Sequence, residues 1–163
     1  MPMPDQHQWI SYLPAFFSTT LAGVALWLSA RQSRTNMAKL RLDLYDKRFA
    51  VYESTLAFYQ ALGGSAESLQ GEPFTSLHRG FIKAFRESQF LFDDDSGVFE
   101  LLKKVSVDAF KVIAAKTRAR EVPGEMAVRM VAEANDTYAK IEKAVDELER
   151  VIAPYIRFSR ALI

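Results

Sequence analysis

The chain of 163 residues is long enough for one domain of ordinary size and short for two. Its 49% hydrophobic and 25% charged residues are typical of a folded protein and exclude a disordered composition. A net charge of +1 provides no broad basic field, so we expect no nucleic-acid partner. The absence of cysteine excludes disulfides and thiolate catalysis.

An uncharged segment of 22 residues, 9–30, dominates the first part of the chain. A helix of this length spans about 33 Å, which is enough to cross a hydrocarbon core of about 30 Å. Trp9 and Tyr12 lie at one end and Trp27 at the other, where aromatic residues meet the two membrane interfaces. We therefore predict a transmembrane helix over 9–30, preceded by a short extracytoplasmic tail over 1–8.

Basic residues follow the span and predict its orientation. Arg31, Arg34, Lys39 and Arg41 form a basic collar, whereas residues 1–8 contain one acid and no Lys or Arg. The positive-inside rule then places residues 31–163 in the cytoplasm and the tail outside a bacterial inner membrane. We also expect the collar to bind anionic lipid at the cytoplasmic face of the bilayer.

A cleaved signal peptide is the main alternative to this anchor. The uncharged run is longer than the roughly 7–15 residues of a signal h-region, and no positive charge precedes it. Leu28 also lies where a cleavage site needs a small residue. These features favour the anchor; cleavage would instead export the remaining domain. A buried core helix is a second alternative, for which 22 uncharged residues is long.

Small residues recur every four positions within the predicted span, at Ala15, Thr19 and Gly23. This spacing lets two membrane helices approach closely, so we expect a helix–helix contact here and self-association of the chain. The span contains no ionisable residue, which argues against a proton or ion pathway along it.

The span is expected to continue without a break into the soluble region, because residues 24–62 contain no Gly or Pro. An apolar stripe with spacings of three and four then predicts a coiled-coil-like packing face. Its members are Leu42, Tyr45, Phe49, Tyr52, Leu56 and Tyr59, with Leu44, Val51 and Phe58 widening it on one side.

Three further helices are predicted, over 74–92, 98–119 and 125–153, with Pro154 ending or kinking the last. We expect Thr75 or Ser76 to cap the first of these. Turns of about 5 to 12 residues connect the helices, as between antiparallel neighbours in a bundle. The expected fold is therefore all-α, with an N-terminal transmembrane helix continuing into a cytoplasmic antiparallel four-helix bundle over 31–163.

Little in the sequence indicates catalysis. His7 and His78 are its two histidines, and there is no metal-ligand spacing of Cys and His and no phosphate-binding loop. The acidic run that begins at Asp93 fails the calcium-loop pattern, since Gly97 falls at position five rather than six. We expect this run to cap a helix, and we expect no enzyme activity, catalytic residue, cofactor or metal.

Arg48 is the one residue that the helical pattern leaves unexplained, because it falls within the apolar arc of its helix. A buried guanidinium requires a partner. We therefore predict an ion pair with Glu87 or with one of Asp93, Asp94 and Asp95. The alternatives are an arginine lying over tyrosine rings with its charged head in water, and an anion-binding residue.

Three blocks of the sequence, KLRLDLYDKRFAVYE, FLFDDD and APYIRFSRALI, resemble a group of uncharacterised bacterial single-pass membrane proteins with a cytoplasmic helical domain. The resemblance implies a location and an architecture; it implies no activity, cofactor or functional residue.

The function expected from these features is that of a membrane-anchored helical interaction or scaffold protein, either self-associating or bound to another membrane protein. The alternative is a membrane-associated sensor or effector. In that case a ligand or partner bound to the cytoplasmic bundle would alter the transmembrane assembly.

Overall fold

A computed structural model describes the backbone of residues 8–156 and the side chains of 27–156, apart from those of residues 30 and 34. The described residues form four α-helices and no strand, so the all-α prediction is confirmed. The helices are α1 (Gln8–Leu62), α2 (Glu72–Leu91), α3 (Val98–Ala119) and α4 (Glu125–Ile156), with a short 3-10 helix η1 (Asp94–Ser96) before α3.

The chain divides into two units, residues 1–43 and 44–163. In the first unit α1 is helical from Gln8, so a helix does occupy residues 9–30. Within the part of the chain that the structure describes, no helix is long and apolar enough to span a membrane. The side chains of Trp9, Tyr12, Ala15, Thr19, Gly23 and Arg34 lie outside the described residues, as do residues 1–7.

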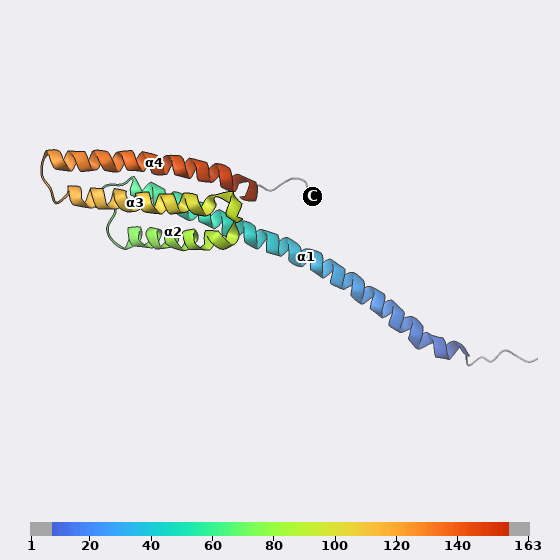
Figure 1. The fold of residues 1–163 in the computed structure, drawn as a ribbon. Helices are drawn as coiled ribbons and strands as arrows, with labels where there is room; N and C mark the ends of the chain where they lie inside the picture. The colour runs from blue at the N-terminus through green and yellow to red at the C-terminus, as the bar shows by residue number, and fades with distance from the viewer. Residues whose placement is uncertain (1–7, 157–163) are drawn as a thin grey trace, which may run out of the picture. The chain divides into compact units, whose positions relative to one another are not determined.

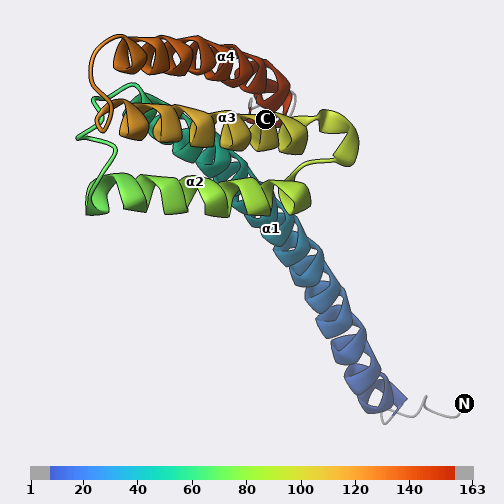
Figure 2. The same cartoon turned by 60° about the vertical axis from the view of Figure 1, so that its left-hand side comes forward.

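The second unit is a bundle of the C-terminal part of α1 with α2, α3 and α4. Each helix runs antiparallel to the preceding one, and α3 lies between α2 and α4 (Figures 1 and 2). The turns are short, with residues 63–71 joining α1 to α2 and 120–124 joining α3 to α4. An antiparallel four-helix arrangement is thus present in this unit.

The bundle core is built from one apolar stripe on each helix. Phe58 of α1 stacks on Phe81 of α2 with ring centroids 4.6 Å apart, and Phe85 of α2 stacks on Phe99 of α3 at 4.9 Å. Such ring pairs add specific geometry to the large apolar area that aromatic side chains bury. The largest fully buried hydrophobic side chains are Phe58, Phe81, Leu62, Leu102, Ile141, Leu148, Ile152, Val51, Val98, Val105 and Val112.

The stripe predicted for α1 is confirmed on one side and wrong on the other. Val51 and Phe58, which were predicted to widen it, are buried in the core, whereas Phe49 is 40% exposed. Thr55, which the prediction left out, is also buried. Positions 51, 55, 58 and 62 also alternate by four and three, so periodicity alone cannot separate the two stripes. The Thr55 hydroxyl satisfies its hydrogen bond within the helix by donating to the Val51 carbonyl at 2.7 Å, which allows a polar residue in the core.

Three predicted helix boundaries differ from the structure, although the end of α2, at Leu91 rather than at residue 92, differs by one residue alone. α2 begins at Glu72, with Gly71 as N-cap and Pro73 in the first turn, so neither Thr75 nor Ser76 caps it. Proline is tolerated there because the first helical N–H groups have no intrahelical acceptor. α4 does not end at Ala153 but continues through Pro154 to Ile156.

Candidate functional site

Arg48 lies on α1, four residues after the start of the second unit at Leu44, and contacts the end of α2 and a ring of α4. Its Nε donates a hydrogen bond of 2.8 Å to the carbonyl of Leu91, the last residue of α2. Its guanidinium carbon lies 5.0 Å from the ring centroid of Tyr155 on α4 and 5.7 Å from that of Phe92. A cation is well placed at a helix C-terminus, whose last carbonyls lack intrahelical donors and carry partial negative charge.

The predicted ion pair of Arg48 is absent from the described residues. Glu87 pairs with Lys83 at 3.8 Å instead. Asp93 accepts a hydrogen bond of 3.4 Å from the Tyr155 hydroxyl. Ring stacking, the alternative, does occur, but the rings come from Tyr155 and Phe92 rather than from tyrosines of α1. The partner atom was missed because a backbone carbonyl has no signature in the sequence.

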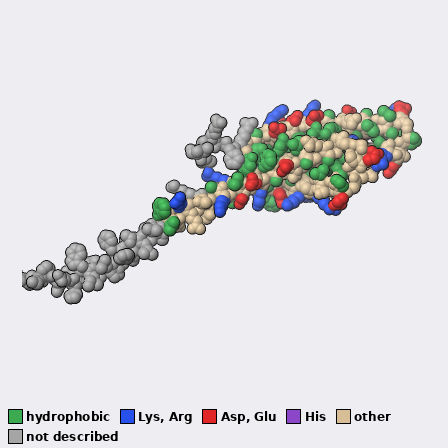
Figure 3. Space-filling model, turned by 180° about the vertical axis from the view of Figure 1, so that it is seen from behind, with side chains coloured by type: hydrophobic (Ala, Val, Ile, Leu, Met, Phe, Trp, Pro, Cys, Tyr) green, Lys and Arg blue, Asp and Glu red, His purple; other side chains and the backbone are tan. Residues whose placement is uncertain are grey.

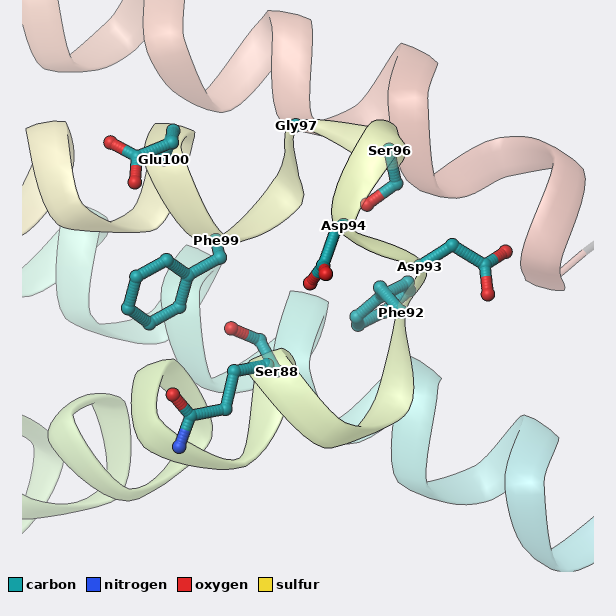
Figure 4. A pocket seen from close by; sticks show the side chains of 9 residues that line it. Ser88, Phe92, Asp93, Asp94, Ser96, Gly97, Phe99 and Glu100 are labelled. Carbon is teal, nitrogen blue, oxygen red and sulfur yellow. The ribbon is translucent and has the colours of Figure 1, made fainter.

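The acidic run 93–95 forms the corner between α2 and α3, beside a pocket of about 350 Å³. Asp94 points into this pocket toward Ser88, while Asp93 points away from it (Figure 4). The expectation that these acids cap a helix is wrong, because the N-cap of α3 is Gly97 and no side-chain cap hydrogen bond is present there. The Ser96 hydroxyl, next to the run, accepts a hydrogen bond of 3.3 Å from the Val98 amide. No group of three or more potential metal ligands occurs among the described residues.

Lys116 on α3 is a second cation that closes the end of another helix, and sequence reasoning missed it. Its Nζ donates to the carbonyls of Leu62 at 2.8 Å and Gly64 at 2.7 Å, where α1 ends. Burial lowers the pKa of Lys116. Its place in the last turn of α3 suggested only a charge that favours the C-terminus of its own helix.

His78 lies in an aromatic cluster rather than in a catalytic arrangement. Its ring stacks on Phe58 at 5.2 Å and meets Phe110 edge-on at 5.7 Å. Burial lowers the pKa of His78, since the charged imidazolium is disfavoured among these rings. No carboxylate of the described chain forms an ion pair with it, so its environment is that of a packed residue.

Tyrosines join α1 to α4 along one seam. The rings of Tyr59 and Tyr138 stack at 4.9 Å, and Tyr138 donates to the Tyr59 carbonyl at 3.4 Å. Seven residues before Tyr59 on α1, the Tyr52 hydroxyl donates a hydrogen bond of 3.4 Å to the Glu149 carboxylate. Burial raises the pKa of both Tyr52 and Tyr59, and carboxylates of α4 raise it further. Both phenols therefore stay neutral near pH 7.

Beside this seam, α1 presents three aromatic rings that we call the aromatic ladder: Tyr45, Phe49 and Tyr52. Neighbouring centroids lie 6.1 Å and 6.2 Å apart. A shallow pocket of about 310 Å³ lies on α4, lined by Asp146, Glu149, Arg150 and Ala153. The seam region thus combines the exposed ring of Phe49 with carboxylates.

The collar predicted to face the membrane is partly described. Arg31 lies over the ring of Trp27 with its guanidinium carbon 5.4 Å from the centroid. Trp27 is 59% exposed, and Arg31, Lys39 and Arg41 are all exposed. A tryptophan next to an arginine on an exposed helix is typical of a membrane interface.

Comparison with protein-family models, with curated proteins and with solved structures found no match to the chain.

Proposed function

We propose that the chain is a membrane-anchored helical interaction protein, with its span over 9–30 and its bundle in the cytoplasm. One observation carries this proposal: α1 is a single helix from Gln8 to Leu62. Its uncharged segment lies at one end, and its other end supplies Val51, Phe58 and Leu62 to the bundle core. An anchor and a folded domain that share one helix are directly coupled.

The interfacial residues support the same proposal. Trp27 lies at the end of the uncharged run and Arg31 directly follows the run, and Lys39 and Arg41 add exposed positive charge further along α1. Each base held near an anionic bilayer contributes about 1 kcal/mol of attraction. Flotation of the purified chain with vesicles measures this term, because vesicles containing phosphatidylserine should retain more protein than vesicles of phosphatidylcholine alone.

A non-catalytic role fits the chemistry of the bundle. His78 is packed among phenylalanine rings, and the cations Arg48 and Lys116 bind backbone carbonyls. These three residues are the ones that a reaction would most readily use, and each has a structural partner.

Self-association through the span is part of this proposal. Replacing Thr19 and Gly23 by Leu would put bulky side chains on the small-residue face and prevent close approach of two helices. The double variant should therefore form a smaller assembly in detergent. The matched control is Thr20→Leu, which changes a neighbouring position on a different face of the helix. Assembly size is read by multi-angle light scattering. Unchanged assembly in the double variant would count against the span as the interface.

A sensor is the second candidate, favoured by the contacts of Arg48. This residue lies on α1 and holds the end of α2 and a ring of α4, so a change in the bundle could rotate or shift α1. The chain lacks cysteine, so a single Ser29→Cys reports disulfide cross-linking between spans without background. A sensor predicts that Arg48→Met changes the cross-linking rate; a passive scaffold predicts the same rate with and without it.

A further inference from the structure

We propose that the aromatic ladder and the carboxylates on both sides of it bind a cationic amphipathic helix of a partner protein. This inference rests on the proposed role as an interaction protein and adds the chemistry of the partner. It concerns the second unit of the chain, where α1 and α4 pack along the tyrosine seam.

The apolar part of the surface is the ladder itself. Phe49 is 40% exposed and Tyr52 is half-buried, although both belong to a stripe with heptad spacing. The core of the bundle uses Val51, Thr55 and Phe58, and Tyr52 packs against its edge, whereas Phe49 is not part of this packing. Figure 3, which shows the bundle from behind, has hydrophobic side chains in the middle of the visible face, with Asp and Glu among them and charged side chains of both signs around them.

Carboxylates flank the ladder on both sides. Asp46 and Glu53 are the i−3 and i+4 helical neighbours of Phe49, on the side away from Tyr52. On the other side, Glu149 accepts from Tyr52, and Asp146 raises the pKa of both Tyr52 and Tyr59. Glu142 acts on Tyr59 in the same way.

None of these five carboxylates forms an ion pair among the residues with described side chains, in contrast to Glu147, which pairs with Arg150 at 3.0 Å. Of the described residues that line the pocket beside the seam, Arg150 is the one base, and its ion pair with Glu147 already occupies it. An aromatic strip between two acidic edges, without an ion pair to any described side chain, selects a partner with apolar residues along its centre and Lys or Arg at its sides. Charge complementarity of this kind steers encounter and suppresses wrong partners.

The same charges disfavour the other occupants. Two copies packed ladder to ladder would bring acidic edges against acidic edges, and phosphate groups of lipid or nucleic acid would be repelled. The ladder and the seam together run along α1 from Tyr45 to Tyr59, a length of about 21 Å. A partner helix of about four turns would match it, with anchor residues at i, i+3 or i+4, and i+7.

The probe is a synthetic 15-residue helical peptide with Leu at the anchor positions and Lys at the flanks; its control has Glu in place of every Lys. Binding is measured by fluorescence anisotropy to the full chain in nanodiscs of zwitterionic lipid, with empty nanodiscs as reference. We expect the basic peptide to bind at least about tenfold more tightly than the acidic one, and its affinity to fall with salt.

Two variants locate the binding on this surface. Phe49→Gln should weaken binding of the basic peptide by about tenfold or more, as loss of a central aromatic anchor does. Asp146→Asn with Glu149→Gln should weaken it and flatten its salt dependence. The matched controls are Phe90→Gln, at an 80% exposed phenylalanine on α2, and Glu133→Gln with Asp136→Asn, at exposed acids of α4. These should stay within about twofold of the unaltered chain.

Equal binding of the two peptides, or full binding by Phe49→Gln, would overturn the proposal. Binding that appears only after deletion of residues 157–163 would assign the surface to the chain's own C-terminal segment and would also overturn it. Loss of self-association in Phe49→Gln would assign it to a second copy, with the same consequence. Failure of the peptide-binding test would leave the results of vesicle flotation and of the Thr19/Gly23 assembly experiment unchanged. Failure of this inference is therefore distinguishable from failure of the proposed function.

Discussion

The ammonium nitrogen of Lys116 on α3 lies 2.8 Å from the carbonyl oxygen of Leu62, the residue at which α1 ends. The same nitrogen lies 2.7 Å from the carbonyl oxygen of Gly64. One side chain thus satisfies the last carbonyl of α1, which helix geometry leaves without a donor, and a second carbonyl in the turn that follows. Arg48 does the same for α2 through Leu91, so a cation from another helix closes the C-terminus of each of the first two helices.

Replacing Lys116 by Met should destabilise the bundle by about 1–3 kcal/mol, because two partly buried carbonyls lose a charged donor. Urea denaturation followed by circular dichroism measures the change in the free energy of unfolding. Lys103→Met is the matched control, since Lys103 is exposed and pairs only with Glu100 on its own helix. An equal loss in both variants would show that the carbonyl contacts of Lys116 contribute nothing specific.

Arg48 and Tyr155 should be energetically coupled. The single variants Arg48→Met and Tyr155→Leu and their double variant form a cycle, in which we expect a coupling of about 0.5–2 kcal/mol. The exposed neighbour Lys47 supplies the control variant Lys47→Met, which should cost less than about 0.5 kcal/mol. Additive losses in the cycle would mean that the guanidinium–ring contact is incidental.

His78 should make stability depend on pH. Its pKa is lowered in the folded chain, so the unfolded chain binds the proton more readily. The contribution is complete above the unfolded pKa of about 6.5 and is lost as the pH falls through the lower folded pKa.

The test compares the free energy of unfolding at pH 7 and pH 5 for the unaltered chain and for His78→Phe. The loss between the two values should be smaller in the variant. An identical loss in His78→Phe would contradict the assignment, because the carboxylates that titrate in the same range are common to both chains.

Truncation to alanine should lower the stability of the chain much more at a core phenylalanine than at a surface phenylalanine. Phe58 is fully buried against the rings of Phe81 and His78, and Phe58→Ala should cost about 3–5 kcal/mol. Phe90 is 80% exposed, and Phe90→Ala should change stability by less than about 0.5 kcal/mol. Thermal unfolding measures both. A small effect at Phe58 would mean that the core lies elsewhere.

Helix type and boundaries were the most predictable part of this fold. α3 was predicted over 98–119 and occupies Val98–Ala119, because Gly97 and the turn after Arg120 mark its ends clearly. The buried face of α1 was less predictable. Tyr45, Phe49 and Tyr52 form a more apolar-looking stripe than one that contains Thr55, and the choice between them depends on where three other helices pack.

The contacts of Arg48 and Lys116 could not be predicted, because their partners are backbone carbonyls more than forty residues away. The sequence did identify Arg48 as a cation within an apolar arc. What it could not supply was the position of the end of α2, which lies beside α1 only after the bundle has formed.

The central claim is that α1 carries a membrane anchor at one end and a cytoplasmic bundle at the other. A topology reporter fused after Ile163 of the full chain in bacterial cells tests it most directly. Green fluorescent protein at this position should fluoresce in the membrane fraction, and alkaline phosphatase should be inactive. Active phosphatase with no fluorescence, or fluorescence that alkaline carbonate washes from the membranes, would contradict the account.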